Sequence, residues 1–226
     1  MALRSRYDGY ADWYDEQFPT LPEEKSLLRE LLDLGNETLC LNVACGTGRY
    51  GGTLSRLGYR VLGVDVSADA LRRARRGVSL LVRADAASLP LRSESVGSAV
   101  GFYFHTDVED FAGVMVEVAR CMKPEARFVY FGLHPCFIGP FVDRTEEAQT
   151  QDLHFKPGYG QGGWAWPDFN QGSGLWVRVG GHHKTMAEFL NAIFDAGLSL
   201  ERVVELDGGG SIAPRNIAVV ASKAHF

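Results

Sequence analysis

The sequence predicts an α/β protein with a doubly wound, Rossmann-like sheet of seven strands, the last of them antiparallel. Three observations support this fold class. Short apolar runs alternate with amphipathic helical patterns between residues 36 and 134. The runs are apolar almost throughout, as expected for parallel strands that helices cover on both faces. A glycine-rich turn follows the first run, and two strand patterns joined by a turn-rich loop close the chain.

Residues 1–34 are expected to form N-terminal helices. Residues 6–17 place Tyr10 and Tyr14 on one helical stripe. A second helix follows Pro22, because proline is favoured in the first turn, and Gly35 marks its end.

Residues 35–134 contain five strands and the helices that connect them. Turn residues bound each apolar run, and Ser67 is a candidate N-cap. The predicted strands are 39–44, 59–66, 79–86, 95–104 and 126–133. The predicted helices are 49–57, 67–76 and 108–122. Ligands of such sheets bind at the carboxyl ends of the strands, so a site is expected there.

Residues 135–183 break the alternation, because a connection of this length is uncommon inside a compact domain. Glycines are interleaved there with aromatic residues, among them Trp164, Trp166 and Phe169. This composition predicts a cap over a substrate. Residues 184–226 add a helix over 184–197 and two antiparallel strands, over 199–206 and 216–222, on either side of a DGGGS loop. The whole chain is predicted to be one domain.

Composition is ordinary for a globular protein that can bury a core. Hydrophobic residues make up 46% of the chain and the net charge is −5. Basic residues cluster only in 71–76, so a nucleic-acid partner is not expected, because phosphate attraction dominates such binding. The chain shows no secretory h-region, no apolar run of membrane-spanning length and no paired cysteine spacing. We therefore expect a cytoplasmic monomer or homodimer without a membrane partner.

The segment NVACGTGRYGG, residues 42–52, allows two interpretations. Gly46, Gly48 and Gly51 spell GxGxxG, which is typical of dinucleotide folds and would indicate an NAD(P)-dependent oxidoreductase. Asp65, about 20 residues later, suits the ribose of either cofactor class. The other frame is a variant of D/ExGxGxG formed by Asn42, Ala44, Gly46 and Gly48.

Three features favour the second frame. The motif lies behind two predicted helices, Asp85 ends the third strand in VRADAASLP, and a hairpin closes the chain where a nicotinamide fold would continue with a second βαβαβ half. Together with YDGYADWYDE, VLGVDVSADALRRAR, EVARCMKPEARFVYFGLHP and HHKTMAEFLNAIFDAGL, these segments resemble the class I S-adenosylmethionine-dependent methyltransferases. The resemblance covers nearly the whole chain and falls in the broad group that includes quinone-biosynthesis-like and small-molecule enzymes.

The resemblance implies S-adenosyl-L-methionine as methyl donor and S-adenosyl-L-homocysteine as product. It implies that the glycine loop holds the methionine end, that Asp65 holds the ribose and that Asp85 faces the adenine. The cofactor contacts expected in this way are Tyr10, Tyr14, Asn42, Ala44, Gly46, Gly48, Asp65, Val66, Asp85, Ala86, Gly101 and Phe102. Asn42 and Ala44 depart from the family pattern, which has an acidic residue and a glycine at these places.

Methyl transfer from a sulfonium is an in-line displacement, so the protein chiefly aligns the reactants. A base is needed only where the acceptor must lose a proton, and the ordinary pKa of histidine suits that role. The candidate bases are His105, His134 and His183. The candidate substrate contacts are Trp164, Trp166, His182 and His183. No acidic trio with metal-ligand spacing is apparent, so no metal is expected.

The leading hypothesis is therefore methyl transfer to the oxygen, nitrogen or carbon of a small organic acceptor. The strand end GFYF, in place of an NPPY-type tetrapeptide, weighs against methylation of DNA adenine or of glutamine. Two alternatives remain open: an NAD(P)-dependent oxidoreductase, and a non-catalytic protein that binds S-adenosylmethionine.

Overall fold

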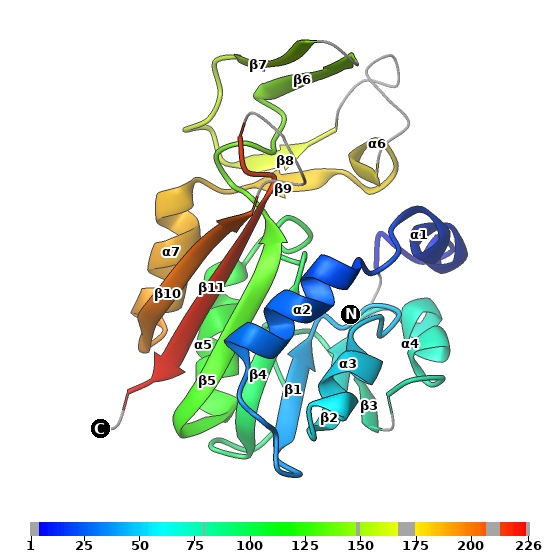
Figure 1. Ribbon diagram of the computed structural model, residues 1–226, viewed down its shortest axis with the longest axis vertical. Coiled ribbons are helices and arrows are strands. Elements are labelled where there is room, and N and C mark those ends of the chain that lie inside the picture. The colour runs from blue at the N-terminus through cyan, green and yellow to red at the C-terminus, as the bar shows by residue number, and fades with distance from the viewer. Residues whose placement is uncertain (1–4, 79, 148–149, 167–174, 207–212, 225–226) are drawn as a thin grey trace.

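The computed structural model shows a seven-stranded sheet with helices on both faces (Figure 1). It describes residues 5–78, 80–147, 150–166, 175–206 and 213–224. The strand order is β10-β11-β5-β4-β1-β2-β3. The strands are β1 (Leu39–Val43), β2 (Arg60–Asp65), β3 (Leu80–Arg83), β4 (Val96–Phe102), β5 (Met122–Leu133), β10 (Leu198–Leu206) and β11 (Asn216–Lys223).

The last strand runs against its neighbours. β11 is antiparallel to both β5 and β10, whereas β1 to β5 pair with one another in parallel. The predicted seven-stranded sheet with an antiparallel last strand is confirmed. The order reverses where β1 lies between β2 and β4, and doubly wound sheets bind ligands outside the carboxyl ends of the strands at such a switch point.

Alternate residues of each strand pack against different helix layers. On β1, Leu41 and Val43 join the core that includes α5 and α7, whereas Cys40 joins the core that includes α2 and α3. In the described ranges no helix is long and apolar enough to cross a bilayer. The helices are α1 (Ala11–Gln17), α2 (Pro22–Leu31), α3 (Gly51–Arg56), α4 (Ala68–Ala74), α5 (Phe111–Cys121), α6 (Leu175–Val179) and α7 (Met186–Asp195).

Two helices, α1 and α5, begin at least three residues later than their patterns predict. The stripe over 6–17 predicts one helix, but α1 begins at Ala11, because Gly9 has a left-handed φ of 88° that a helix cannot include. The helix expected over 108–122 begins after Asp110, whose carboxylate caps it by accepting the Gly113 N–H at 2.8 Å. Strand β5 begins at residue 122, four residues earlier than expected, because α5 continues directly into it.

The expected N-cap at Ser67 is confirmed, since its hydroxyl accepts the Ala70 N–H at 3.1 Å. Phe169 and the DGGGS loop lie outside the described residues.

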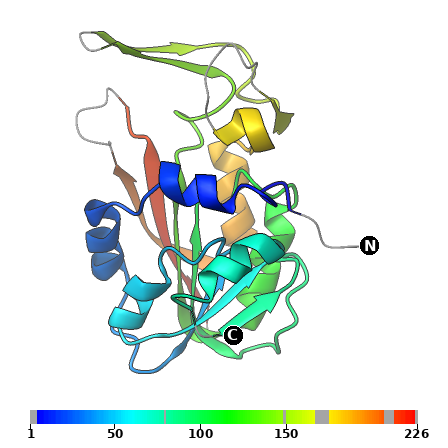
Figure 2. The same cartoon turned by 90° about the vertical axis from the view of Figure 1, so that its right-hand side faces the viewer.

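The segment after β5 lies above the carboxyl edge of the sheet, at the top of Figure 1. Its described elements are β6 (Val142–Glu147) paired with β7 (Thr150–Phe155), β8 (Gly163–Ala165) paired with β9 (Gly181–His183), and α6. Figure 2 shows α1 lying across the carboxyl edge, below α6. The Arg178 guanidinium of α6 lies 4.4 Å from the centre of the Trp13 ring of α1, so the two elements are in contact.

Candidate active site

A cavity of about 300 Å³ lies at the carboxyl ends of β1, β2 and β4, beneath the N-terminal segment. This volume is at the lower end of the range for small-molecule sites. The predicted cofactor residues on its wall are Tyr14, Ala44, Gly46, Asp65, Val66, Asp85, Ala86 and Phe102. The structure therefore brings residues from the ends of several strands into one cavity.

The turn after β1 has a left-handed backbone at three alternate positions. Ala44, Gly46 and Gly48 have φ values of 49°, 53° and 77°. Such values are unfavourable for residues with a Cβ, which explains why a glycine is usual where this chain has Ala44. A Cβ on Gly46 would meet no atom within 4 Å, whereas one on Gly48 would lie 3.0 Å from the Ala74 Cβ. Gly46 thus leaves backbone open to the cavity, and Gly48 lets the loop pack on α4.

Asp65 joins this turn to the end of β2. Its carboxylate accepts the backbone N–H of Gly46 and that of Ser67, each at 2.8 Å. Burial raises the pKa of Asp65, while these backbone donors oppose the rise. Because an ionised carboxylate accepts about four hydrogen bonds, Asp65 can also accept donors from a ligand in the cavity.

Asp85 and Ala86 lie just beyond β3, at another side of the same cavity. The Asp85 carboxylate accepts the Ala87 N–H at 2.9 Å and is exposed. Val66 and Phe102 also contribute to the wall, and Phe102 stacks on Tyr50 with ring centres 3.9 Å apart. The wall of the cavity therefore includes both apolar side chains and an exposed carboxylate.

The N-terminal segment is held over the cavity by polar contacts with the core. The Tyr7 hydroxyl donates to Asp107 at 2.7 Å, and the Ser67 hydroxyl donates to Asp8 at 2.6 Å. The Thr47 hydroxyl donates to Asp15 of α1. These contacts tie a segment far away in sequence to the glycine loop and to the ends of β2 and β4.

Tyr7 and Asp107 were not among the predicted site residues, although both line the cavity. Burial raises the pKa of Asp107 to about 7, and the charge of Asp65 acts in the same direction. The hydrogen bond from Tyr7 opposes the rise. The available sequence signal was the position of Asp107 just after the fourth strand, at the edge where the site was expected.

None of the three predicted histidine bases lies on the cavity wall. His105 is buried with its Nδ1 2.5 Å from the Tyr130 hydroxyl oxygen, and burial lowers its pKa to about 3. His183 is buried and donates from Nε2 to the Tyr159 carbonyl at 2.7 Å. These contacts favour structural roles for both rings.

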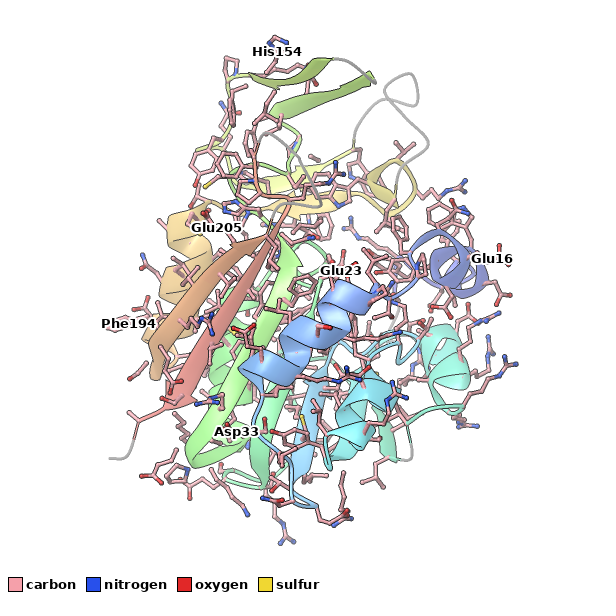
Figure 3. The ribbon with its side chains drawn as sticks, in the orientation of Figure 1. Glu16, Glu23, Asp33, His154, Phe194 and Glu205 are labelled. Atoms are coloured by element: carbon pink, nitrogen blue, oxygen red, sulfur yellow. The ribbon has the colours of Figure 1, made fainter. Side chains whose placement is uncertain are left out.

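His134 lies just beyond β5, where its Nδ1 accepts the Cys136 N–H at 3.1 Å. Its Nε2 donates to Glu205 at 2.8 Å. Figure 3 shows Glu205 at the end of β10 nearest the cap. His134 therefore bridges the sheet and the start of the cap.

Of the predicted substrate contacts, Trp164 lies on the cavity wall. The Arg6 guanidinium lies 3.3 Å from the centre of the Trp164 ring and 5.2 Å from that of Trp166. Trp166 is 57% exposed. His182 packs edge-on against Trp164 and accepts a hydrogen bond from Lys184 at 2.9 Å, so it lies behind the wall.

Four predicted cofactor residues lie off the wall. Tyr10 packs on Trp13, and Gly48 packs on α4. Gly101 is buried against Phe104, which would clash with a Cβ at 2.3 Å. Asn42 is buried, and neither atom of its side-chain amide has a hydrogen-bond partner among the described residues. The hypothesis that these residues contact a cofactor stays a prediction.

Comparison with known proteins gives consistent matches. Residues 41–130 match a family model described as a methyltransferase domain. The chain is 26% identical over 160 residues to YqeM of Bacillus subtilis, which is named as a methyltransferase. The matched segment is 66% of this chain and 64% of YqeM. It is 30% identical over 107 residues to the demethylmenaquinone methyltransferase of Tropheryma whipplei, which is 45% of each chain. The chain thus spans about half to two thirds of these relatives.

The fold also matches solved structures. An S-adenosylmethionine-dependent methyltransferase from Mesorhizobium loti superposes with a TM-score of 0.74 at 24% identity. The match covers 88% of this chain and 96% of that one. At this identity the likeness concerns the fold alone.

Proposed function

We propose that the chain belongs to the class I S-adenosylmethionine-dependent methyltransferases, since residues 41–130 match a methyltransferase domain and the fold matches such an enzyme. From this premise we propose that it transfers the methyl group of S-adenosyl-L-methionine to a small organic acceptor. One observation carries the proposal: the open turn at Gly46, Asp65 and Asp85 line a single cavity at the switch point of the sheet. The family match speaks against the oxidoreductase that GxGxxG alone would indicate, because the matched domain includes this motif.

The wall residues fit the parts of this cofactor. Asp65 has acceptor capacity beyond its two backbone bonds, which suits the ribose hydroxyls. Asp85 and Ala86 would hold the adenine edge. The aromatic rings of Tyr7 and Tyr14, 5.7 Å apart and edge-on, suit a cationic sulfur through cation–π attraction. When bound, the cofactor supplies a methyl group that is already activated.

The protein's own contribution would be alignment, exclusion of water and acceptance of a proton. The N-terminal segment covers the cavity, and its hydrogen bonds to the core hold it there. Asp107 is the best placed base, because it lies on the wall and burial raises its pKa to about 7, near neutral pH. The histidine bases expected from the sequence stay predictions, which their contacts do not favour.

The acceptor side of the cavity is formed by the cap. Trp164, Val179 and Gly180 line it together with Val108. This side is largely apolar, with Trp164 as its aromatic ring and Arg6 over the face of that ring, which favours a largely apolar acceptor. The Tropheryma whipplei relative is named for a quinone precursor. We therefore extend the proposal to a planar ring acceptor, methylated at an oxygen, nitrogen or carbon.

Thermal unfolding tests the cofactor assignment. S-adenosyl-L-homocysteine at 100 times its Kd stabilises a protein by about 2.7 kcal/mol, which raises Tm by roughly 5–10 °C for a chain of this length. NAD⁺ and NADH at the same concentration are expected to leave Tm unchanged. A shift with NAD(H) alone would instead support the oxidoreductase. Mass spectrometry of planar phenols and quinols incubated with methyl-labelled S-adenosylmethionine then tests turnover.

A further inference from the structure

The residue after Gly48 places a cation on the cavity wall. Arg49 and Arg6 are the two basic residues among those that line the cavity within the described chain. The Arg49 guanidinium lies 4.9 Å from the centre of the Tyr14 ring and 5.6 Å from that of Tyr50. It also donates to the Tyr14 hydroxyl at 3.3 Å. The two rings flank the guanidinium, and among the described residues only the Tyr14 hydroxyl accepts a hydrogen bond from it, so its other donors are available to a ligand.

Arg49 has no acidic partner within 4 Å among the residues that the structure describes. The carboxylate of Glu24 acts on it through the longer-range field. The Glu24 carboxylate already accepts three hydrogen bonds. They come from the hydroxyls of Tyr103 and Tyr50, at 2.7 and 3.0 Å, and from the Leu21 N–H at 3.0 Å. A partly buried guanidinium without a paired carboxylate is suited to bind one from a ligand, in a bidentate pair.

The other charged residues on the cavity wall indicate which carboxylate of a ligand Arg49 would bind. Asp65 and Asp85 would repel an anion at the nucleoside end of the cavity. Arg6 stacks on Trp164 and donates to the Val179 carbonyl, so it belongs to the acceptor side. Arg49 is continuous in the chain with the turn expected to hold the methionine end.

We propose that Arg49 binds the α-carboxylate of the cofactor's amino-acid tail, which makes it a cofactor-binding residue that sequence motifs did not single out. The inference rests on the proposed function. It also has a structural competitor: Arg49 could serve only to hold Tyr14 and α1 over the cavity. If Arg49 had only this structural role, its loss would weaken the binding of every ligand of the cavity alike. If Arg49 contacts the carboxylate, its loss weakens only ligands that carry the amino-acid tail.

The experiment compares two ligands by isothermal titration calorimetry. S-adenosyl-L-homocysteine carries the tail, and 5′-methylthioadenosine has the same nucleoside thioether without it. Arg49→Gln is expected to weaken the binding of S-adenosyl-L-homocysteine about 10- to 100-fold, because a charge-assisted pair would be lost. Its affinity for 5′-methylthioadenosine should stay within about twofold of the unaltered protein. Arg49→Lys keeps the charge but loses the planar guanidinium, so its affinity for S-adenosyl-L-homocysteine should lie between those of the unaltered protein and Arg49→Gln. Arg60→Gln, at an exposed position, is the control.

A second arm uses the unaltered protein. The carboxamide of S-adenosyl-L-homocysteine should bind it about as weakly as the acid binds Arg49→Gln, so the test does not depend on the variant's folding. Equal weakening of both ligands in Arg49→Gln, or no weakening of either, overturns the inference and leaves the proposed function standing. Failure of the unaltered protein to bind either ligand overturns the proposed function itself and the inference with it.

Discussion

At the residue scale, Asp65 links the shape of the cavity to its charge. The same carboxylate holds the Gly46 and Ser67 amides and faces the cavity. Its position on the cavity could be expected from sequence, because an acid at the end of the second strand is local to its motif. The roles proposed for Tyr7, Arg49 and Asp107 could not, because each depends on a partner distant in the chain.

Replacement of Asp65 by alanine is expected to weaken S-adenosyl-L-homocysteine binding by about 100-fold, since charge-assisted hydrogen bonds to the ribose would be lost. Calorimetry measures the change in Kd. Asp195→Ala, an exposed acid at the end of α7, is the matched control and should bind normally. Unchanged affinity in Asp65→Ala would refute the assignment of the nucleoside to this end of the cavity.

At the element scale, the glycine loop must pass close to α4 while it keeps its left-handed turns. Gly48 meets both demands, because its φ is 77° and its Cα faces Ala74 of α4. The loop would move away from α4 if a side chain were added there. The position of Gly46 and of Asp65, which are bonded to each other, would then change as well.

Gly48→Ala is expected to lower the free energy of unfolding by about 2–3 kcal/mol, from left-handed strain and from the contact with Ala74. Urea denaturation measures it. Gly77→Ala is the control within the same α4 region, because a Cβ there meets no atom within 4 Å and the chain does not need a positive φ. It should be neutral or stabilise slightly. Equal effects of the two substitutions would contradict this account of the loop.

At the scale of the whole molecule, two buried groups give the stability opposite dependences on pH. Burial raises the pKa of Asp107 to about 7, so the folded state holds a proton that the unfolded state releases between pH 4 and 7. Its contribution to stability therefore falls as pH rises through that window. Burial lowers the pKa of His105 to about 3, so its contribution is lost as pH falls below 6.5.

A comparison with Asp107→Asn isolates the first of these effects, since both proteins share His105 and asparagine can still accept the Tyr7 hydrogen bond. The variant should gain stability relative to the unaltered protein as pH rises from 5 to 8, by about 1–3 kcal/mol. Denaturation at both pH values measures the difference. Asp65 and Lys184 also act on Asp107, and both are unchanged in the comparison. A difference that stays constant with pH would show that Asp107 has an ordinary pKa.

The sequence by itself determined the class of fold and the glycine loop, and it placed Asp65 and Asp85 at the edge of the sheet where the cavity lies. These depend on local patterns: apolar strand runs, turn glycines and acids placed at strand ends. The antiparallel β11 was also predictable, because the hairpin it forms with β10 is short in sequence.

Only the tertiary structure decided which side chains face the cavity. The three histidines lie near the carboxyl edge, as expected, but each is occupied by another partner, whereas Asp107 and Arg49 reach the wall. Strand position fixes the edge at which a residue lies, but not the direction of a loop side chain. That direction depends on packing and hydrogen bonds with segments up to about a hundred residues away, as for Tyr7 and Asp107.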